Sequence, residues 1–127
     1  MPVKVVDASA IGALLFGEPK AQEIADILGN AALAAPALLW FEVASICLKK
    51  VHAHENLMED ILSAFNMMDK LPIQAVEVAH QEVVQMAREL SLSTYDASYL
   101  WLAERLDGDL VTLDEKMHKA MSLKESL

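Results

Sequence analysis

The chain has 127 residues, a formal net charge of −9 and 54% hydrophobic residues. This length is typical of one domain, and the high apolar content with few glycines and prolines excludes a disordered chain. The negative balance excludes a protein that grips nucleic acid through a broad basic surface, although a bound divalent cation can still meet the phosphates of such a substrate. Because there is no Gly/Ser-rich linker and no repeat, residues 1–127 are expected to form a single domain.

Two apolar segments were compared with secretory signals and membrane spans. The N-terminal run is interrupted by Asp7 and is a poor signal sequence. Residues 31–48 are long enough to span a membrane, but they contain Pro36 and Glu42, and an ionised Glu inside a bilayer is costly. The single Cys47 has no partner for an internal disulfide, which favours the cytoplasm.

The first part of the chain predicts two strands among helices. "VKVVD" is a short β-branched run, typical of a buried strand at about 3–7. "SAIGALLF" predicts a short helix capped by Ser9, and "PKAQEIADILG" has helical spacing up to a stop at Gly29. "AALAAP" predicts a short strand, and a helix of about 37–51 is expected to begin after Pro36.

The second part repeats this alternation. "ENLMEDILSAFNMMDK" is expected to be one helix, followed by a small strand near 72–75 and the helix "AHQEVVQMARELS". "STYDASYLWLAERLDG" predicts a helix capped by Ser93 or Thr94. "DLVTLD" predicts a strand at 109–113, before a short helix "EKMHKAM". Short strands that alternate with helices predict an α/β fold with a small parallel sheet.

Acidic residues follow the first and the last predicted strand. Asp7 closes the first, Asp114 closes the last, and sites in open parallel sheets form at the carboxyl ends of strands. Glu42 lies in a helix that is apolar on nearly every side and is therefore expected to be buried, where a lone ionised Glu is costly. Asp96 lies in the first turn of another apolar helix.

Each of these acids also has a simpler explanation. Asp7 and Asp114 are suited to capping the helices that follow them, Asp96 to a helix N-terminus, and Glu42 to a buried Lys or Arg. Together, and with no obvious basic partners, they favour an acidic pocket. Carboxylates in one pocket repel unless a cation joins them, and an all-oxygen ligand set suits Mg²⁺ or Mn²⁺ better than zinc. Such an ion can polarise a phosphodiester and activate a water.

Four segments carry these acids, in the order "VVDASAI", "LLWFEVASIC", "STYDASYLWLA" and "DLVTLDEKM". In their order, spacing and total length the chain resembles the PIN domain family, in particular the VapC-type ribonuclease toxins of prokaryotic toxin–antitoxin pairs. The resemblance covers essentially the whole chain. It implies a PIN-like three-layer α/β fold and a Mg²⁺- or Mn²⁺-dependent endoribonuclease that hydrolyses RNA phosphodiester bonds.

The resemblance also implies roles for the four acids. Asp7 and Asp96 are implied metal ligands, directly or through water, and Asp114 completes the metal site. Glu42 is implied to hold or deprotonate the attacking water. The RNA target, the cleavage sequence and the number of metal ions stay open.

Ser9 and Thr112 match small hydroxyl positions of the family and are implied to orient the carboxylates, with a helix cap and an ordinary strand residue as the alternatives. The resemblance further implies a homodimer and an antitoxin of the VapB type, which places a basic side chain in the acidic pocket. Residues that line its apolar groove, or belong to the core, are Leu14, Leu15, Phe16 and Trp40. Lysines expected either at RNA phosphates or on a solvated surface are Lys49, Lys50, Lys116 and Lys119.

Two other classes of function share part of this sequence pattern. An aspartate-based phosphotransferase also uses an Asp after its first strand, but the dehalogenase pattern needs a second acid where Ser9 stands. Receiver domains need an acid pair before the first helix, and none is evident. A non-catalytic PIN-like binding module is disfavoured because all four acids are present, and it predicts that Asp7→Asn or Asp96→Asn changes neither toxicity nor metal affinity.

Overall fold

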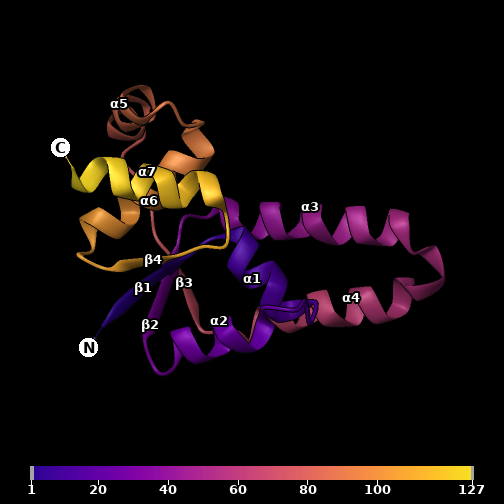
Figure 1. Ribbon diagram of the computed structural model, residues 1–127. Helices are drawn as coiled ribbons and strands as arrows, with labels where there is room; N and C mark the ends of the chain where they lie inside the picture. Colours follow the sequence, from indigo (N-terminus) through magenta and orange to yellow (C-terminus); the bar gives the residue numbers. More distant parts are fainter. Residues whose placement is uncertain (1, 127) are drawn as a thin grey trace.

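The computed structural model describes residues 2–126, and in them four short strands form one parallel sheet flanked by helices (Figure 1). This confirms the predicted α/β class; residues 1 and 127, the ends of the predicted domain, lie outside the described residues. The elements in chain order are β1 (Val3–Val6), α1 (Ala8–Leu15), α2 (Ala21–Leu28), β2 (Ala32–Ala35), α3 (Leu38–Ala53), η1 (Glu55–Leu57), α4 (Met58–Asn66), η2 (Met67–Lys70), β3 (Ile73–Ala75), α5 (His80–Leu90), α6 (Thr94–Arg105), β4 (Asp109–Val111) and α7 (Glu115–Glu125).

The order of the strands reverses beside the first strand. The sheet has the order β3-β2-β1-β4, and all neighbours are parallel. Val5 of β1 pairs with Ala34 on one side and with Leu110 on the other. The chain therefore builds outward from β1 through β2 and β3, and then crosses back to place β4 on the opposite side. Ligands of open α/β sheets bind at such a reversal, outside the carboxyl ends of the strands.

The core surrounds β1. Val5 and Val6 are completely buried, and α6 packs against both β1 and β4 (Figure 1). Fully burying an aliphatic side chain of this kind contributes about 1.5–3 kcal/mol, so the apolar run "VKVV" fixes the central strand. Gly108 allows β4 to start beside this strand, because a Cβ at that position would lie 2.6 Å from the carbonyl oxygen of Val3.

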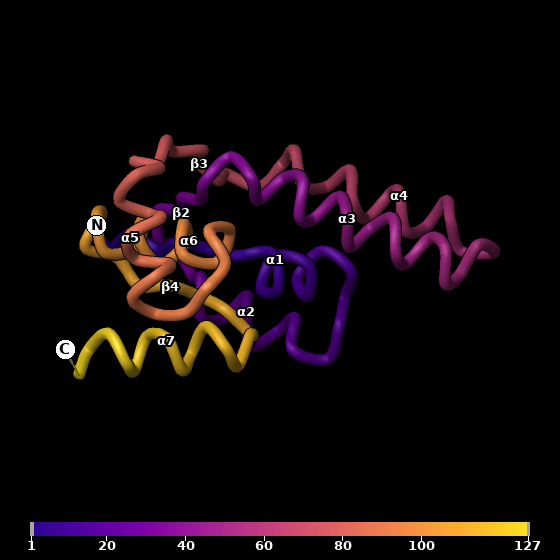
Figure 2. The backbone as a smooth tube through the Cα atoms, turned by 90° about the horizontal axis from the view of Figure 1, so that it is seen from above, coloured from indigo at the N-terminus to yellow at the C-terminus, as the bar shows by residue number. Residues whose placement is uncertain are grey.

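The α3 helix projects from the core instead of lying buried within it. It runs beside α4 as a helical hairpin that extends away from the sheet (Figures 1 and 2). The prediction of a helix buried all round was wrong, because Phe41 is 81% exposed and Leu48 is 56% exposed. One face of α3 packs inward through Leu39, Val43 and Cys47. Helices α1 and α4 also lie against α3, and they leave Phe41 and Leu48 exposed.

Several predicted boundaries also shift. The single helix expected before β3 is α4 with a short 3-10 turn at each end. β4 ends at Val111, so Thr112 lies in a loop and not in the predicted strand of 109–113. The last helix continues to Glu125. Among residues 2–126, no helix combines the length and apolar character needed to cross a membrane.

Candidate active site

Asp7 lies where β1 ends and α1 begins, beside the reversal of the strand order. Its carboxylate caps α1 by accepting a hydrogen bond from the backbone nitrogen of Ala10 at 3.1 Å. Ser9, the predicted cap, instead donates its hydroxyl to Oδ1 of Asp7 at 2.7 Å. The side chain of Asp7 is only 6% exposed. Asp7 can therefore be both a helix cap and a site residue, because the capping hydrogen bond holds its carboxylate at the edge of the sheet.

A second set of hydrogen bonds ties the loop after β4 to Asp7. The hydroxyl of Thr112 donates to Oδ2 of Asp7 and accepts from the backbone nitrogen of Asp114 at 3.0 Å. The oxygen of Ser9 accepts from the backbone nitrogen of Leu113 at 2.9 Å. Thr112 and Ser9 thus join the ends of β1 and β4, two segments more than 100 positions apart in sequence.

His118 holds the same loop from α7. Its Nε2 lies 2.9 Å from the carbonyl oxygen of Thr112, within hydrogen-bonding distance. The residue is exposed, yet its ring also contacts the segment that carries Thr112 and Asp114.

The electrostatics of Asp7 reflect this enclosed position. Burial raises the pKa of its carboxyl above the ordinary 3.8, and hydrogen bonds from Thr112, Ser9 and the Ala10 backbone oppose that rise. The negative charge of Asp114 raises it further. Burial thus shifts this carboxyl toward its neutral form, whereas a cation beside it would favour the ionised form.

Glu42 extends from α3 and is half-buried. The prediction left open a buried Lys or Arg as its partner, but the partner is Tyr99 of α6, whose hydroxyl donates to Oε1 at 2.5 Å. Burial raises the pKa of Glu42, the hydrogen bond from Tyr99 lowers it, and the charges of Asp96 and Asp7 raise it. Glu42 also lines a surface hollow of about 340 Å³.

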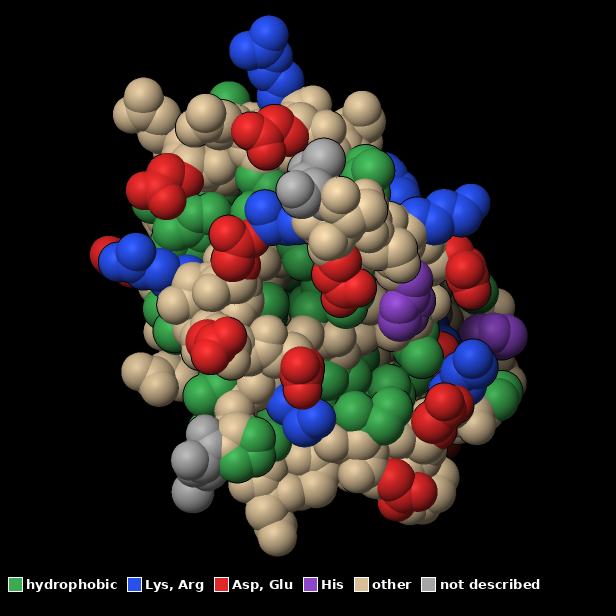
Figure 3. All heavy atoms as spheres, turned by 60° about the vertical axis from the view of Figure 1, so that its left-hand side comes forward, with side chains coloured by type: hydrophobic (Ala, Val, Ile, Leu, Met, Phe, Trp, Pro, Cys, Tyr) green, Lys and Arg blue, Asp and Glu red, His purple; other side chains and the backbone are tan. Residues whose placement is uncertain are grey.

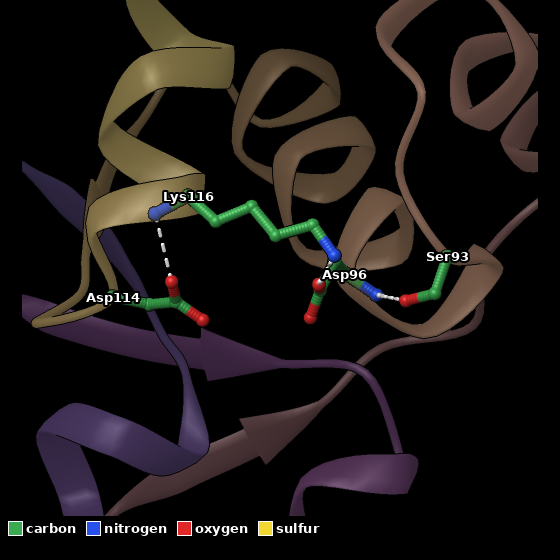
Figure 4. A network of polar contacts seen from close by, with 4 residues as sticks. All are labelled: Ser93, Asp96, Asp114 and Lys116. Atoms are coloured by element: carbon green, nitrogen blue, oxygen red, sulfur yellow. Dashed lines mark hydrogen bonds and ion pairs between the residues drawn. The ribbon is translucent and has the colours of Figure 1, made fainter.

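Asp96 and Asp114 lie at the N-termini of α6 and α7 (Figure 4). The backbone nitrogen of Asp96 donates to the hydroxyl of Ser93 at 3.0 Å, and Asp114 caps α7 by accepting from the backbone nitrogen of Lys116 at 2.8 Å. The side chain of Lys116 crosses to Asp96, where its Nζ lies 3.7 Å from Oδ2. The expectation that no basic residue accompanies the acids was therefore wrong for Asp96.

These acids suit a magnesium-type ion by their chemistry. Among residues 2–126, no three acidic, His or Cys side chains meet closely enough to form a ready cage. Mg²⁺ does not need one, because it usually takes one or two carboxylates and keeps several waters. Oδ2 of Asp7 accepts one hydrogen bond, from Thr112, and retains a lone pair. The oxygen-only donor set therefore fits Mg²⁺ or Mn²⁺, provided that the ammonium group of Lys116 moves away from Asp96.

The PIN domain model matches residues 4–122. The chain belongs to the PIN domain family. It is also 36% identical over 121 residues to Ribonuclease VapC3 of Pyrobaculum aerophilum, a match that covers 89% of this chain and 90% of that protein. The four acids and the two hydroxyl residues all lie within the matched segment, as the resemblance of the sequence to this family requires.

Two solved structures share the fold. The crystal structure of PAE2754 from Pyrobaculum aerophilum superposes with a TM-score of 0.62 at 27% identity, covering 94% of this chain and 86% of that one. VapC20 of Mycobacterium tuberculosis, a toxin that cleaves the sarcin–ricin loop, superposes with a TM-score of 0.67 and covers 92% of this chain and 94% of its own. At 12% identity, this second match supports the PIN fold alone.

The sequence reasoning missed Tyr99 and the pairing of Lys116 with Asp96. A usable indication existed for Tyr99, since it lies one helical turn after Asp96 and the two share a face of α6. No comparable pattern indicated Lys116, which follows Asp114 by two positions and reaches Asp96 only because α6 and α7 start near the same sheet edge.

Proposed function

We propose that this PIN domain protein is a VapC-type endoribonuclease that hydrolyses RNA phosphodiester bonds with the help of Mg²⁺ or Mn²⁺. The observation that carries the proposal is the hydrogen-bond network of Asp7, Ser9 and Thr112, which fixes a buried carboxylate at the reversal point of the sheet. Asp96 and Glu42 lie within electrostatic reach of each other and of this network. The kinship with Ribonuclease VapC3 supports RNA as the substrate.

In this proposal Asp7, Asp96 and Asp114 hold the metal ion, directly or through water. When bound, the ion polarises the scissile phosphodiester and lowers the pKa of a water molecule. Ser9 and Thr112 keep the Asp7 carboxylate oriented through their hydroxyl groups. The expected products are a 5′-phosphate and a 3′-hydroxyl.

Glu42 is the proposed general base. Its Oε1 is occupied by Tyr99, which leaves Oε2 to accept a proton from the attacking water. Burial raises the pKa of Glu42 and brings it nearer to neutral pH, where a base transfers protons most effectively. Its position on the hollow beside α3 gives water and RNA access to the carboxylate.

The distribution of charge is consistent with metal-assisted binding of phosphate. The chain carries a net charge of −9, and on the face in Figure 3 acidic side chains are spread among scattered lysines and arginines. On this face the described residues form no continuous basic patch. A divalent ion can supply the positive charge that the protein surface lacks at the cleavage point.

We further propose a VapB-like antitoxin and a homodimer as partners. A hollow of about 420 Å³ lies where Phe16 and Leu15 face Leu57 and Ile61 of the helical hairpin, and it suits an apolar antitoxin segment. Phe41 lies outside this hollow and lines the second hollow, beside α3, together with Tyr95, and both of these aromatic side chains are strongly exposed. This single-domain enzyme would act in the cytoplasm.

The test is cleavage of a mixed pool of structured and single-stranded RNA with Mg²⁺, Mn²⁺ or EDTA. The variants are Asp7→Asn and, as a matched control, Asp69→Asn, which alters an exposed acid in η2. Cleavage that needs metal, survives in Asp69→Asn and is lost in Asp7→Asn supports the proposal. Equal cleavage by both variants, or no cleavage by the folded wild type, would overturn it and favour a non-catalytic binding module.

A further inference from the structure

Tyr99 is a buried tyrosine of α6 whose hydroxyl contacts Glu42 of the acidic site. Its side chain is 2% exposed and belongs to the inward face of α6. The hydroxyl donates to Oε1 of Glu42 at 2.5 Å, a short charge-assisted hydrogen bond across 57 positions of sequence. The bond joins α6, which carries Asp96, to α3, which carries Glu42.

The surroundings keep this hydroxyl protonated. Burial raises the pKa of the Tyr99 phenol, and so do the hydrogen bond to Glu42 and the negative charges of Glu42, Asp7 and Asp96. Tyr99 therefore remains a hydrogen-bond donor at any pH at which the enzyme works. The negative charges of Glu42 on α3, Asp7 at the end of β1 and Asp96 on α6 thus all lie within electrostatic reach of the Tyr99 hydroxyl.

Glu42 depends on this bond for its orientation. Its side chain has several rotatable bonds, and fixing such a side chain costs conformational entropy. Among residues 2–126 the hydrogen bond from Tyr99 is the one side-chain hydrogen bond that the Glu42 carboxylate accepts. It engages Oε1 alone, so it directs the carboxylate and leaves Oε2 without a side-chain donor among the described residues, and Glu42 also lines the hollow.

We propose that Tyr99 is a positioning residue of this enzyme, whose buried hydroxyl holds Glu42 so that Oε2 faces the attacking water. The inference rests on the proposed function, in which Glu42 accepts the proton of that water. Tyr99 itself touches neither substrate nor metal, and it acts through Glu42.

A purely structural role makes a different prediction. Buried tyrosines usually find a partner for their hydroxyl, so the alternative is that Tyr99 and Glu42 pair for stability alone. In that case Tyr99→Phe would lower the melting temperature and leave the cleavage rate of the folded protein unchanged. A positioning role instead predicts a loss that appears in kcat and depends on Glu42.

The experiment is a double-mutant cycle of Tyr99→Phe and Glu42→Gln, with Trp101→Phe as the control. Trp101 also donates from α6 to a carboxylate, that of Glu82 at 3.2 Å, but away from the site. In full-length protein with Mn²⁺, Tyr99→Phe is expected to lower kcat by about tenfold to a hundredfold with little change in KM. It should cause no further loss when Glu42 is already Gln, and Trp101→Phe should cleave like the wild type.

Two outcomes would overturn the inference. One is an unchanged kcat in Tyr99→Phe, and the other is a loss of kcat in the double variant equal to the product of the two single losses. The carboxyl ¹³C titration of Glu42 in metal-free protein provides a readout without cleavage. Because the hydrogen bond from Tyr99 lowers the pKa of Glu42, Tyr99→Phe should raise it, whereas Trp101→Phe should not. If the wild type cuts no RNA, the proposed function fails, and this titration still decides whether Tyr99 controls the Glu42 carboxylate.

Discussion

The acidic site has two halves that differ in how firmly their side chains are held. In the buried half, Asp7 accepts hydrogen bonds at both carboxylate oxygens, one of them from Thr112. In the open half, Asp96 and Asp114 lie at helix N-termini, and Asp96 has an ion pair with the partly exposed Lys116. The buried half holds the Asp7 carboxylate in one orientation, at the cost of removing its charge from water. The open half can exchange its partners, and we expect metal and substrate to enter there.

The largest difference between the halves should appear when each loses a carboxylate charge. Asp7→Asn is expected to reduce the rate of RNA cleavage about a thousandfold or more, because no neighbouring group can replace a charge fixed in this position. Asp114→Asn should cost about tenfold to a hundredfold, because a water can substitute for a ligand of the open half. Single-turnover rates at saturating Mn²⁺ provide the measurement. Losses of equal size would mean that the halves do not differ.

Removal of the Thr112 hydroxyl tests whether the rigidity of the buried half matters. Thr112→Val keeps the shape of the side chain but deprives Asp7 of a donor and the Asp114 backbone nitrogen of an acceptor. The affinity for Mn²⁺ should fall by about tenfold to a hundredfold, as for other groups that orient metal ligands. Isothermal calorimetry measures this change, with Ser122→Ala on the exposed side of α7 as the control. An unchanged affinity would assign Thr112 to folding alone.

The pH dependence of stability tests the desolvation cost of Asp7. Its pKa is raised by burial above 3.8, so the folded protein keeps this proton to higher pH than the unfolded chain. The neutral carboxyl therefore stabilises the fold fully below 3.8, and this contribution is lost as pH rises through the raised pKa. In EDTA at pH 7, Asp7→Asn should unfold with a free energy about 1 kcal/mol higher than the wild type.

That advantage of Asp7→Asn should shrink as pH falls through the raised pKa and should vanish below 3.8, where the wild-type carboxyl is neutral in both the folded and the unfolded state. Urea unfolding at several pH values gives the difference directly. A variant that is less stable than the wild type at pH 7 would show that the hydrogen bonds to Asp7 outweigh its burial.

Replacement of Lys116, the ion-pair partner of Asp96 in the open half, should give the smallest change in metal affinity. Its ammonium group lies 3.7 Å from Asp96 and competes with a metal ion for the same charge. Lys116→Met should tighten the binding of Mn²⁺ by up to about fivefold, since exposed ion pairs are worth at most about 1 kcal/mol. Lys119→Met, one turn further along the exposed face of α7, should have no effect. Weaker binding in Lys116→Met would assign Lys116 a supporting role at the metal site.

The sequence predicts what depends on short-range patterns. The apolar run before Asp7, the stop at Gly29 and the cap at Ser93 each act within a few residues, and the structure has a strand, a helix end and a helix cap at these places. The parallel class of the sheet follows from the alternation of strands and helices. The gathering of Asp7 and Asp114 at one edge follows from that class, because both come after parallel strands.

The remaining features depend on how distant segments meet. The burial of α3 depends on which elements pack around it. Because only one of its faces meets the core, its apolar sequence wrongly predicted a helix buried on all sides. Tyr99 meets Glu42 only because its position on α6 brings the hydroxyl to α3. Lys116 meets Asp96 only because α6 and α7 begin near the same edge of the sheet. No local pattern records these distances.

The most direct test of the two halves as one metal site is a crystal structure of the wild-type protein with Mn²⁺. We predict an anomalous peak bonded to Asp7 and to at least one of Asp96 and Asp114, with the ammonium group of Lys116 moved away from Asp96. Mn²⁺ bound only elsewhere on the protein, with Lys116 still paired to Asp96, would contradict the assignment of these acids as a metal site.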